Sequence, residues 1–498
     1  MLLLFLISPV LGALVSEPQP PSPRSSVVPT LSWLPVRLNH FDASNNDTFL
    51  MRYYYNNEFA TSNNVVIVVG GPWSIAPDWV TGGLPHELAE KIGAGLFYTE
   101  HRYYGQTRPT SDTSVPELRF LSTDQALGDL AQFIQHVKSD QFEGGRFSGG
   151  QVALAGCALA GSLATWMRLA YPHLVSAAFS DSGPLLAQDE FAEYLEVVWE
   201  ALRVQGGAEC VATLDEAMER LFADMLTQEG PDRISRMFNT CTPINGSDPL
   251  DTTTFFWWGV LQPLARLVQS ARPGDIAGVC DVLTDTSVPP LQAVVTERLA
   301  SWVTSQAAGC LQASYTALLA EHTNTSYDAP RSADRLWMYQ SCVQFGWHHT
   351  TASFYSFHNA VALPYFRNLC RQYFSDDFDD TLQWEGIERT NLLFGGLSVL
   401  PDRVLSVAAR HDPNSLLTPN TTHATQLSPV YVLQEGSQCQ VISSSEESAP
   451  PHVRAVRRAA LLNMQELVAG RPPSHVAGAP PLAPVILIVL LASLALVL

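Results

Sequence analysis

The chain has 498 residues, of which 46% are hydrophobic and only 15% are charged, and its formal net charge is −20. This length and apolar content suffice for one large domain with an insertion or for two domains. The strong negative charge argues against nucleic acid and against anionic membrane surfaces as partners.

The chain opens with an apolar stretch, LLLFLISPVLGALV at residues 2–15, followed by the polar and proline-rich SEPQPPSPRSS. This pattern predicts a secretory signal peptide over residues 1–16, although no basic residue precedes the apolar run. A buried N-terminal helix is the alternative, and the proline-rich continuation disfavours it. Residues 17–30 are expected to form a linker. Four N-x-[ST] sequons agree with secretion and are the expected glycosylation sites: Asn46, Asn245, Asn324 and Asn420.

Apolar strand patterns and a helical pattern alternate in residues 31–186, the expected first part of the core domain. Strands are predicted at residues 63–71, 94–99, 152–154 and 176–179. A helix is predicted over 122–137, behind a Ser/Thr cap. This alternation is typical of an α/β fold with a doubly wound, mostly parallel sheet.

Residues 152–175, VALAGCALAGSLATWMRLAYPHLV, have the layout of a nucleophile elbow: an apolar strand, a tight turn of small residues and a helix. In serine hydrolases this elbow reads G-x-S-x-G, with the serine on the strained turn. Here the turn runs from Gly156 to Gly161 as GCALAG, so Ala158 stands where the nucleophile is expected.

Residues 187–375 show helical periodicity without a convincing parallel strand, which predicts a helical insertion. Six of the eight cysteines lie there, and cysteines in a secreted chain predict disulfides. The α/β pattern returns over residues 376–468, with strands predicted at 403–409 and 429–433 and a last helix at 453–468. No metal-binding motif is present in the sequence, and the adjacent pair His348-His349 is expected on a solvated surface.

A Pro/Ala-rich spacer at residues 469–484 precedes the apolar run VILIVLLASLALVL at 485–498. The run is shorter than the roughly 20 apolar residues of a bilayer span, and small residues lie just upstream at 477–479. This pattern favours a glycolipid-anchor signal, with a single membrane span as the alternative. We therefore expect an extracellular or cell-surface protein of the secretory pathway, and the lysosome is the alternative location.

Five further segments, in this order, resemble the serine peptidase family of lysosomal Pro-X carboxypeptidase, dipeptidyl peptidase II and thymus-specific serine protease. The resemblance covers about residues 34–468 and implies an α/β-hydrolase fold interrupted by a helical, disulfide-bonded cap. It also implies cleavage of peptides next to proline by a Ser-Asp-His triad. The segments are EHRYYG at 100–105, LRFLSTDQAL at 118–127, WMRLAYPH at 166–173, WMYQSC at 337–342 and NLLFGG at 391–396.

Only one of the three triad positions keeps its residue in this chain. The family's elbow serine falls on Ala158, its acid on Asp412 and its histidine on Gln438. Alanine has no oxygen to attack a carbonyl, and glutamine cannot take up and return a proton near neutral pH. The backbone N–H of Leu159, directly after the lost nucleophile, remains a candidate donor for an oxyanion hole.

These losses predict an inactive homologue, a pseudopeptidase that binds peptides or a protein partner and needs no cofactor. The alternative is an active serine-type peptidase that cleaves peptides at proline bonds through another nucleophile, and a third option is a scaffold for partners. Cys157 is one position off on the turn, and Ser162 lies a helical turn beyond it, so neither fits the nucleophile's role. The oligomeric state, a homodimer included, stays open.

The resemblance implies three bridges in the cap, Cys210–Cys280, Cys241–Cys310 and Cys342–Cys370. A fourth bridge, Cys157–Cys439, is a further hypothesis. In an α/β-hydrolase the elbow and the histidine loop face each other, and these two cysteines flank the vacated serine and histidine positions. The alternative is a buried Cys157 that packs as a small apolar side chain.

Overall fold

An eight-stranded sheet forms the centre of the computed structural model, which describes residues 17–285, 294–307, 309–353, 357–447 and 449–474. The strand order is β1-β2-β4-β3-β5-β6-β9-β10. β2 runs antiparallel to both β1 and β4, and all other neighbours are parallel. The strands are β1 (Thr30–Arg37), β2 (Thr48–Asn56), β3 (Val65–Val68), β4 (Gly95–Thr99), β5 (Val152–Cys157), β6 (Ala177–Asp181), β9 (Val404–Ala409) and β10 (Val430–Leu433).

Helices cover both faces of this sheet, which is why the central strands are apolar along their whole length. Every residue of β3 and β5 is buried. One face packs against α1 (Gly83–Ile92), α16 (Gln440–Ser443) and α17 (Pro451–Val468). The other packs against α3 (Thr123–Val137) and α4 (Leu159–Ala170). The expected α/β fold with a mostly parallel sheet is confirmed.

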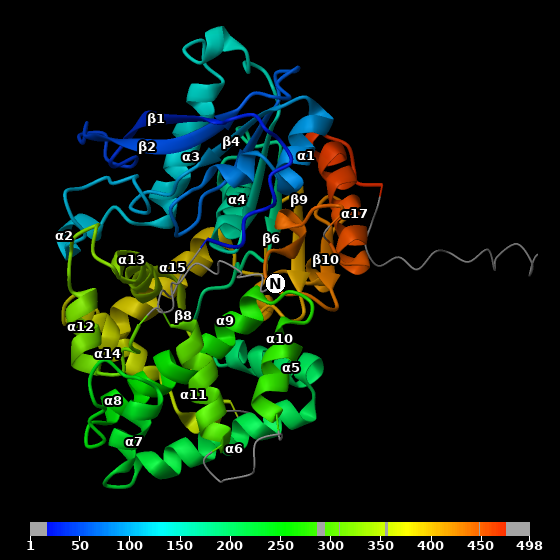
Figure 1. Cartoon of the computed structure of the whole chain (residues 1–498). Coiled ribbons are helices and arrows are strands. Elements are labelled where there is room, and N and C mark those ends of the chain that lie inside the picture. The colour runs from blue at the N-terminus through cyan, green and yellow to red at the C-terminus, as the bar shows by residue number, and fades with distance from the viewer. Residues whose placement is uncertain (1–16, 286–293, 308, 354–356, 448, 475–498) are drawn as a thin grey trace, which may run out of the picture.

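Between β6 and β9 the chain forms a layer of helices, drawn mainly in green beneath the sheet in Figure 1. Three disulfides tie this helical cap together in the pairs that the resemblance implied, with Cα–Cα distances of 5.3, 4.8 and 5.8 Å. The α-helices are α5 (Glu193–Gly206), α6 (Ala208–Met225), α7 (Gly230–Met237), α8 (Pro249–Thr254), α9 (Gln262–Ser270), α10 (Asp275–Thr284), α11 (Val294–Gln306), α12 (Tyr315–His322), α13 (Ser332–Gln340), α14 (Leu363–Tyr373) and α15 (Asp380–Phe394).

One expectation for this region was wrong, because the cap segment does contain a parallel strand pair. β7 (Gln188–Glu190), at the start of the cap, and β8 (Gly346–His348), farther along it, pair in a small second sheet. Strands of three residues are too short to show a period of two in the sequence. The domain boundaries otherwise stay a prediction.

The predicted signal peptide and C-terminal anchor signal lie outside the described residues. Within the described ranges, no helix has both the length and the apolar character that a membrane crossing requires. The four sequon asparagines all lie in the described part and are exposed to solvent, and their glycosylation stays a prediction.

Candidate active site

The nucleophile elbow is present, with alanine at its tip. Ala158 joins β5 to α4 with φ 50° and ψ −131°, a strained conformation that a non-glycine residue rarely adopts. Its N–H donates to the Asp181 carbonyl at 3.0 Å, and its own carbonyl accepts from Gly161 at 2.8 Å. A Cβ on Gly156 would lie 2.1 Å from the Ala160 carbonyl oxygen, so the tight turn requires glycine there. The backbone of the elbow is therefore retained although its serine is absent.

The N-terminus of α4 lies directly at this turn. Leu159 is the first residue of the helix, and the first N–H groups of a helix have no acceptor within it. Leu159 also lines the cavity above the elbow. The oxyanion role of its N–H, which the sequence suggested, stays a prediction.

Asp412, the one retained triad residue, is fully buried just after β9. Its Oδ1 accepts a hydrogen bond from the Asn414 N–H at 3.0 Å, whereas its buried Oδ2 has no hydrogen-bond partner within the described residues. Burial is the main reason that the pKa of Asp412 rises from 3.8 to about 7. In an intact triad the carboxylate accepts a hydrogen bond from the histidine Nδ1. Here that bond is missing.

Gln438 lies in the loop that follows β10 and faces the same cavity as Ala158. Its backbone N–H donates to the carbonyl of Gln269 in α9 at 3.2 Å, so this loop also contacts the cap. The next residue, Cys439, takes a left-handed conformation with φ 62° and is the N-cap of α16. Ala158 and Gln438, two of the positions that the resemblance assigned to the triad, thus line one cavity, and Asn414, two residues after Asp412, lines it as well. The assignment of the three positions to a triad stays a prediction.

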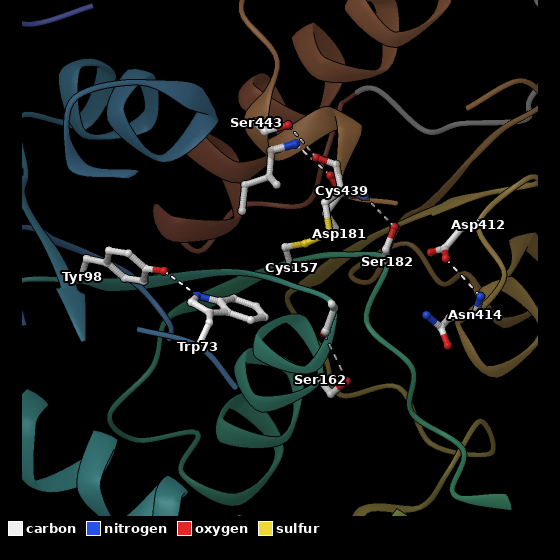
Figure 2. Close-up of a disulfide and its surroundings, with 12 residues drawn as sticks. Trp73, Tyr98, Cys157, Ser162, Asp181, Ser182, Asp412, Asn414, Cys439 and Ser443 are labelled. Atoms are coloured by element: carbon white, nitrogen blue, oxygen red, sulfur yellow. Dashed lines mark hydrogen bonds between the residues drawn. A yellow bond between two sulfur atoms is a disulfide. The ribbon is translucent and has the colours of Figure 1, made fainter. Parts of the chain in front are cut away.

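A disulfide between Cys157 and Cys439 joins the elbow to this loop (Figure 2). The two Cα atoms are 5.6 Å apart, and both side chains are buried. Ser182, at the end of β6, accepts a hydrogen bond from the Cys439 N–H at 3.1 Å. The elbow and the vacated histidine position are therefore linked covalently, where an active enzyme links them by a hydrogen bond between serine and histidine.

Three nearby residues that carry suitable chemistry are engaged elsewhere. The Ser162 hydroxyl is buried and donates to the Pro184 carbonyl at 2.5 Å. The Cys157 sulfur belongs to the disulfide. His411 precedes the acid, but its Nδ1 pairs with Gln205 of the cap at 2.8 Å. None of the three offers a free nucleophile or base at the elbow.

A cavity of about 420 Å³ lies above the elbow, between the core and the cap. Its walls combine aromatic and basic side chains, a mixture that suits an apolar peptide segment with a polar end. Sequence reasoning did not find these residues, because most of them come from the cap and reach the elbow only in the folded chain. They are Trp73, Tyr194, Arg266, Arg272, Trp337, Trp347 and His349.

The expectation that His348-His349 lies on a solvated surface was wrong. His348 is buried at the end of β8, and the His349 ring stacks on Tyr194 with 3.6 Å between ring centroids. Burial lowers the pKa of both imidazoles, to about 4 and about 3. Among the described residues, no group of three or more His, Cys, Asp and Glu side chains is placed to hold a metal ion.

The raised pKa of Asp412 predicts that its substitution by asparagine stabilises the protein at high pH. An acid whose pKa is higher in the folded state favours folding most below its unfolded pKa, and that stability is lost as the pH rises toward about 7. The shift corresponds to about 4 kcal/mol at most. We expect Asp412→Asn to unfold a few degrees above the unmodified protein at pH 8, with a much smaller difference at pH 4, measured by thermal unfolding.

The exposed Asp402 lies close in sequence and gives the matched control. Asp402→Asn should leave the pH dependence of unfolding unchanged. Equal pH profiles for Asp412→Asn and the unmodified protein would contradict the prediction.

Comparison with known proteins identifies the family. The family model for serine carboxypeptidase S28 matches residues 36–460. The thymus-specific serine proteases of Mus musculus and Homo sapiens are 30% and 26% identical, cover 88% of this chain each, and are themselves covered over 87% and 86%. The lysosomal Pro-X carboxypeptidase of Homo sapiens is 28% identical over 33% of this chain and 34% of its own length. This chain therefore belongs to the serine carboxypeptidase S28 family.

Proposed function

We propose that this protein is a catalytically silent member of its family that binds peptides or a protein partner in the cavity above the elbow. The observation that carries the proposal is the alanine methyl at the tip of a retained elbow. The backbone still holds residue 158 in the strained conformation of a nucleophile, but the side chain has no atom that can attack a carbonyl.

The second lost group removes the proton transfer as well. Gln438 faces the cavity in the loop where the family's histidine belongs, and Asp412 has no imidazole to orient. In subtilisin, loss of either the serine or the histidine lowers turnover by about a millionfold, and loss of both costs little more. We therefore expect the oxyanion donor Leu159 and substrate binding alone to support only a very low rate of turnover.

Peptide binding is what the remaining features support. The cavity keeps its aromatic walls, and Arg266 and Arg272 contribute positive charge to them. The relatives carry the names serine protease and Pro-X carboxypeptidase, so proline-containing peptides are the first ligands to examine. Four disulfides fit a protein of the secretory pathway, and we propose the extracellular space or cell surface as its location.

The test uses the purified secreted protein with a serine-reactive fluorophosphonate and a library of Pro-X and X-Pro peptides. We expect no covalent labelling and no cleavage, together with measurable binding of a subset of the peptides. Turnover that survives Ser162→Ala but disappears in Asp412→Ala would show an active triad and overturn the proposal. Absence of both cleavage and binding would leave the scaffold alternative instead.

A further inference from the structure

The first described residues of the chain, 17–22, form part of the wall of the cavity. Glu17, Pro18, Gln19, Pro20 and Ser22 all line it, together with the elbow and the cap. This segment, EPQPPS, was expected to be a free linker from its composition. We call it the N-terminal strap.

The strap is held on the core side by a buried polar chain. The Tyr98 hydroxyl in β4 donates to Glu17 Oε1 at 3.0 Å, and it accepts from Trp73 Nε1 at 2.8 Å. Trp73 and Tyr98 are both buried, and Trp73 is itself a wall of the cavity (Figure 2 shows this pair). A carboxylate in this position is ordered by hydrogen bonding within the fold.

On the cap side the strap contacts the turn after α9. Arg272 Nε donates to Gln19 Oε1 at 2.7 Å. The strap therefore bridges core and cap across the cavity, through Glu17 on the core side and Gln19 on the cap side.

Downstream residues fasten the strap to the sheet domain. Pro21 is buried against the start of α1, and a Cβ on Gly82 would lie 2.4 Å from the Ser22 carbonyl oxygen. The Arg24 N–H donates to the Thr81 carbonyl at 2.8 Å, and the Arg24 guanidinium pairs with Glu87. Gln19, Pro20 and Ser22 are exposed to solvent, so the strap is anchored to the sheet domain at Pro21 and at the neighbouring Arg24.

The chemistry of the strap matches that of the cavity it enters. Three prolines in six residues favour an extended, polyproline-like chain that loses little entropy on binding, and aromatic-lined grooves bind such chains. We propose that the strap is an intramolecular ligand of the cleft, and that peptides bind there by displacing it. This inference rests on the proposed peptide-binding function and adds a regulatory element to it.

The proposal is tested with a fluorescent synthetic peptide of the strap's own sequence, Glu-Pro-Gln-Pro-Pro-Ser, titrated into the full-length secreted protein. In Glu17→Ala/Gln19→Ala both side-chain contacts are removed, so the cleft is free more often. When the strap occupies the cleft in part of the molecules, the apparent Kd of the added peptide equals its intrinsic Kd divided by the fraction of molecules with a free cleft. We expect the double variant to bind the peptide at least about tenfold more tightly than the unmodified protein.

Gly82→Ala provides a second release variant, because its new methyl collides with the backbone of Ser22 rather than with the cleft. Pro23→Ala is the matched control, since Pro23 is exposed and does not line the cavity. The control should bind the peptide as weakly as the unmodified protein. Since the expected result is a gain of binding, a poorly folded variant cannot imitate it.

The outcomes separate the two proposals. Equal affinity for the peptide in the unmodified protein and in both release variants would contradict the proposal that the strap occupies the cleft. The proposed peptide-binding function would be unaffected by that result. Failure of every variant to bind this peptide or any library peptide would overturn the peptide-binding function and the strap with it. A secreted protein whose N-terminus, determined by mass spectrometry, lies beyond Ser22 would also overturn the strap.

Discussion

A variant that carries both Ala158→Ser and Gln438→His is expected to react with a fluorophosphonate, whereas Ala158→Ser alone should react hardly at all. The elbow already holds residue 158 in the conformation of a nucleophile. A serine without a base is not activated, so the single change lacks its proton acceptor. Asp412 supplies the third group, the buried carboxyl that orients the imidazole in a triad.

The size of the expected effect follows from how the triad works as a unit. Its serine and histidine together account for about a millionfold in turnover in subtilisin, and each alone accounts for nearly all of it. A large gain is therefore expected only when both residues return. Labelling rate and hydrolysis of Pro-X and X-Pro peptides measure it.

Two controls isolate the triad from a general effect of the new side chains. Ala158→Ser combined with Gln440→His places the imidazole on the same cavity wall, two positions along, and should stay inert. Adding Asp412→Asn to the restored variant should lower its turnover by about 10⁴-fold, the cost of this change in a serine protease. Equal labelling of the serine-only variant and the restored one would show that Gln438 is not the base position.

The elbow and its lack of a serine could be predicted from the sequence, because the residues that form the elbow are contiguous in the chain. A buried strand, a turn of small residues and a helix follow one another within residues 152–175, and steric rules connect such a sequence to one backbone path. The strand itself was predicted too short, at 152–154, because Ala155 and Gly156 are weak strand formers, which pairing with β6 holds in the sheet.

The cavity and the strap were not predictable, because their residues meet only through tertiary packing. Tyr194 and His349 stack in the cap although 155 positions separate them in the chain. Local hydrophobic periodicity in the sequence cannot predict such a contact. The N-terminal strap has the composition of a linker, and its order comes from partners such as Tyr98 and Arg272. Composition predicts how the segment behaves when it is free in solution. Its conformation in the folded protein is determined by its contacts with the rest of the chain.

β1 shows the same limit at the edge of the sheet. Its sequence TLSWLPVR contains Pro35, which argues against a strand in isolation. The structure accommodates it because β1 is the outermost strand and only one of its edges is paired. No strand pairs with the outer edge of β1, so the N–H that proline lacks is not needed for a hydrogen bond there.

Loss of the Cys157–Cys439 disulfide is expected to destabilise the protein more than loss of a cap disulfide. The bridge joins residues 282 positions apart, against 28 for Cys342–Cys370. In the chain-entropy description, loops of these lengths correspond to about 5.6 and about 3.6 kcal/mol, and the cap bridges inside the longer loop reduce the first value somewhat. We expect Cys157→Ala/Cys439→Ala to unfold at a clearly lower temperature, measured at one fixed scan rate because such proteins unfold irreversibly.

The matched control is Cys342→Ala/Cys370→Ala, whose cysteines are equally buried. It should lose less stability and leave peptide binding unchanged, whereas removal of Cys157–Cys439 should weaken binding, since it frees the loop that carries Gln438 into the cavity. Each single alanine variant at 157 or 439 should match the double one, because a bridge needs both sulfurs. Unfolding of the double variant at the unmodified temperature, with free thiols at 157 and 439 in the secreted protein, would show that the bond does not form. The Cys157–Cys439 bond thus stands where a working triad has a hydrogen bond between serine and histidine.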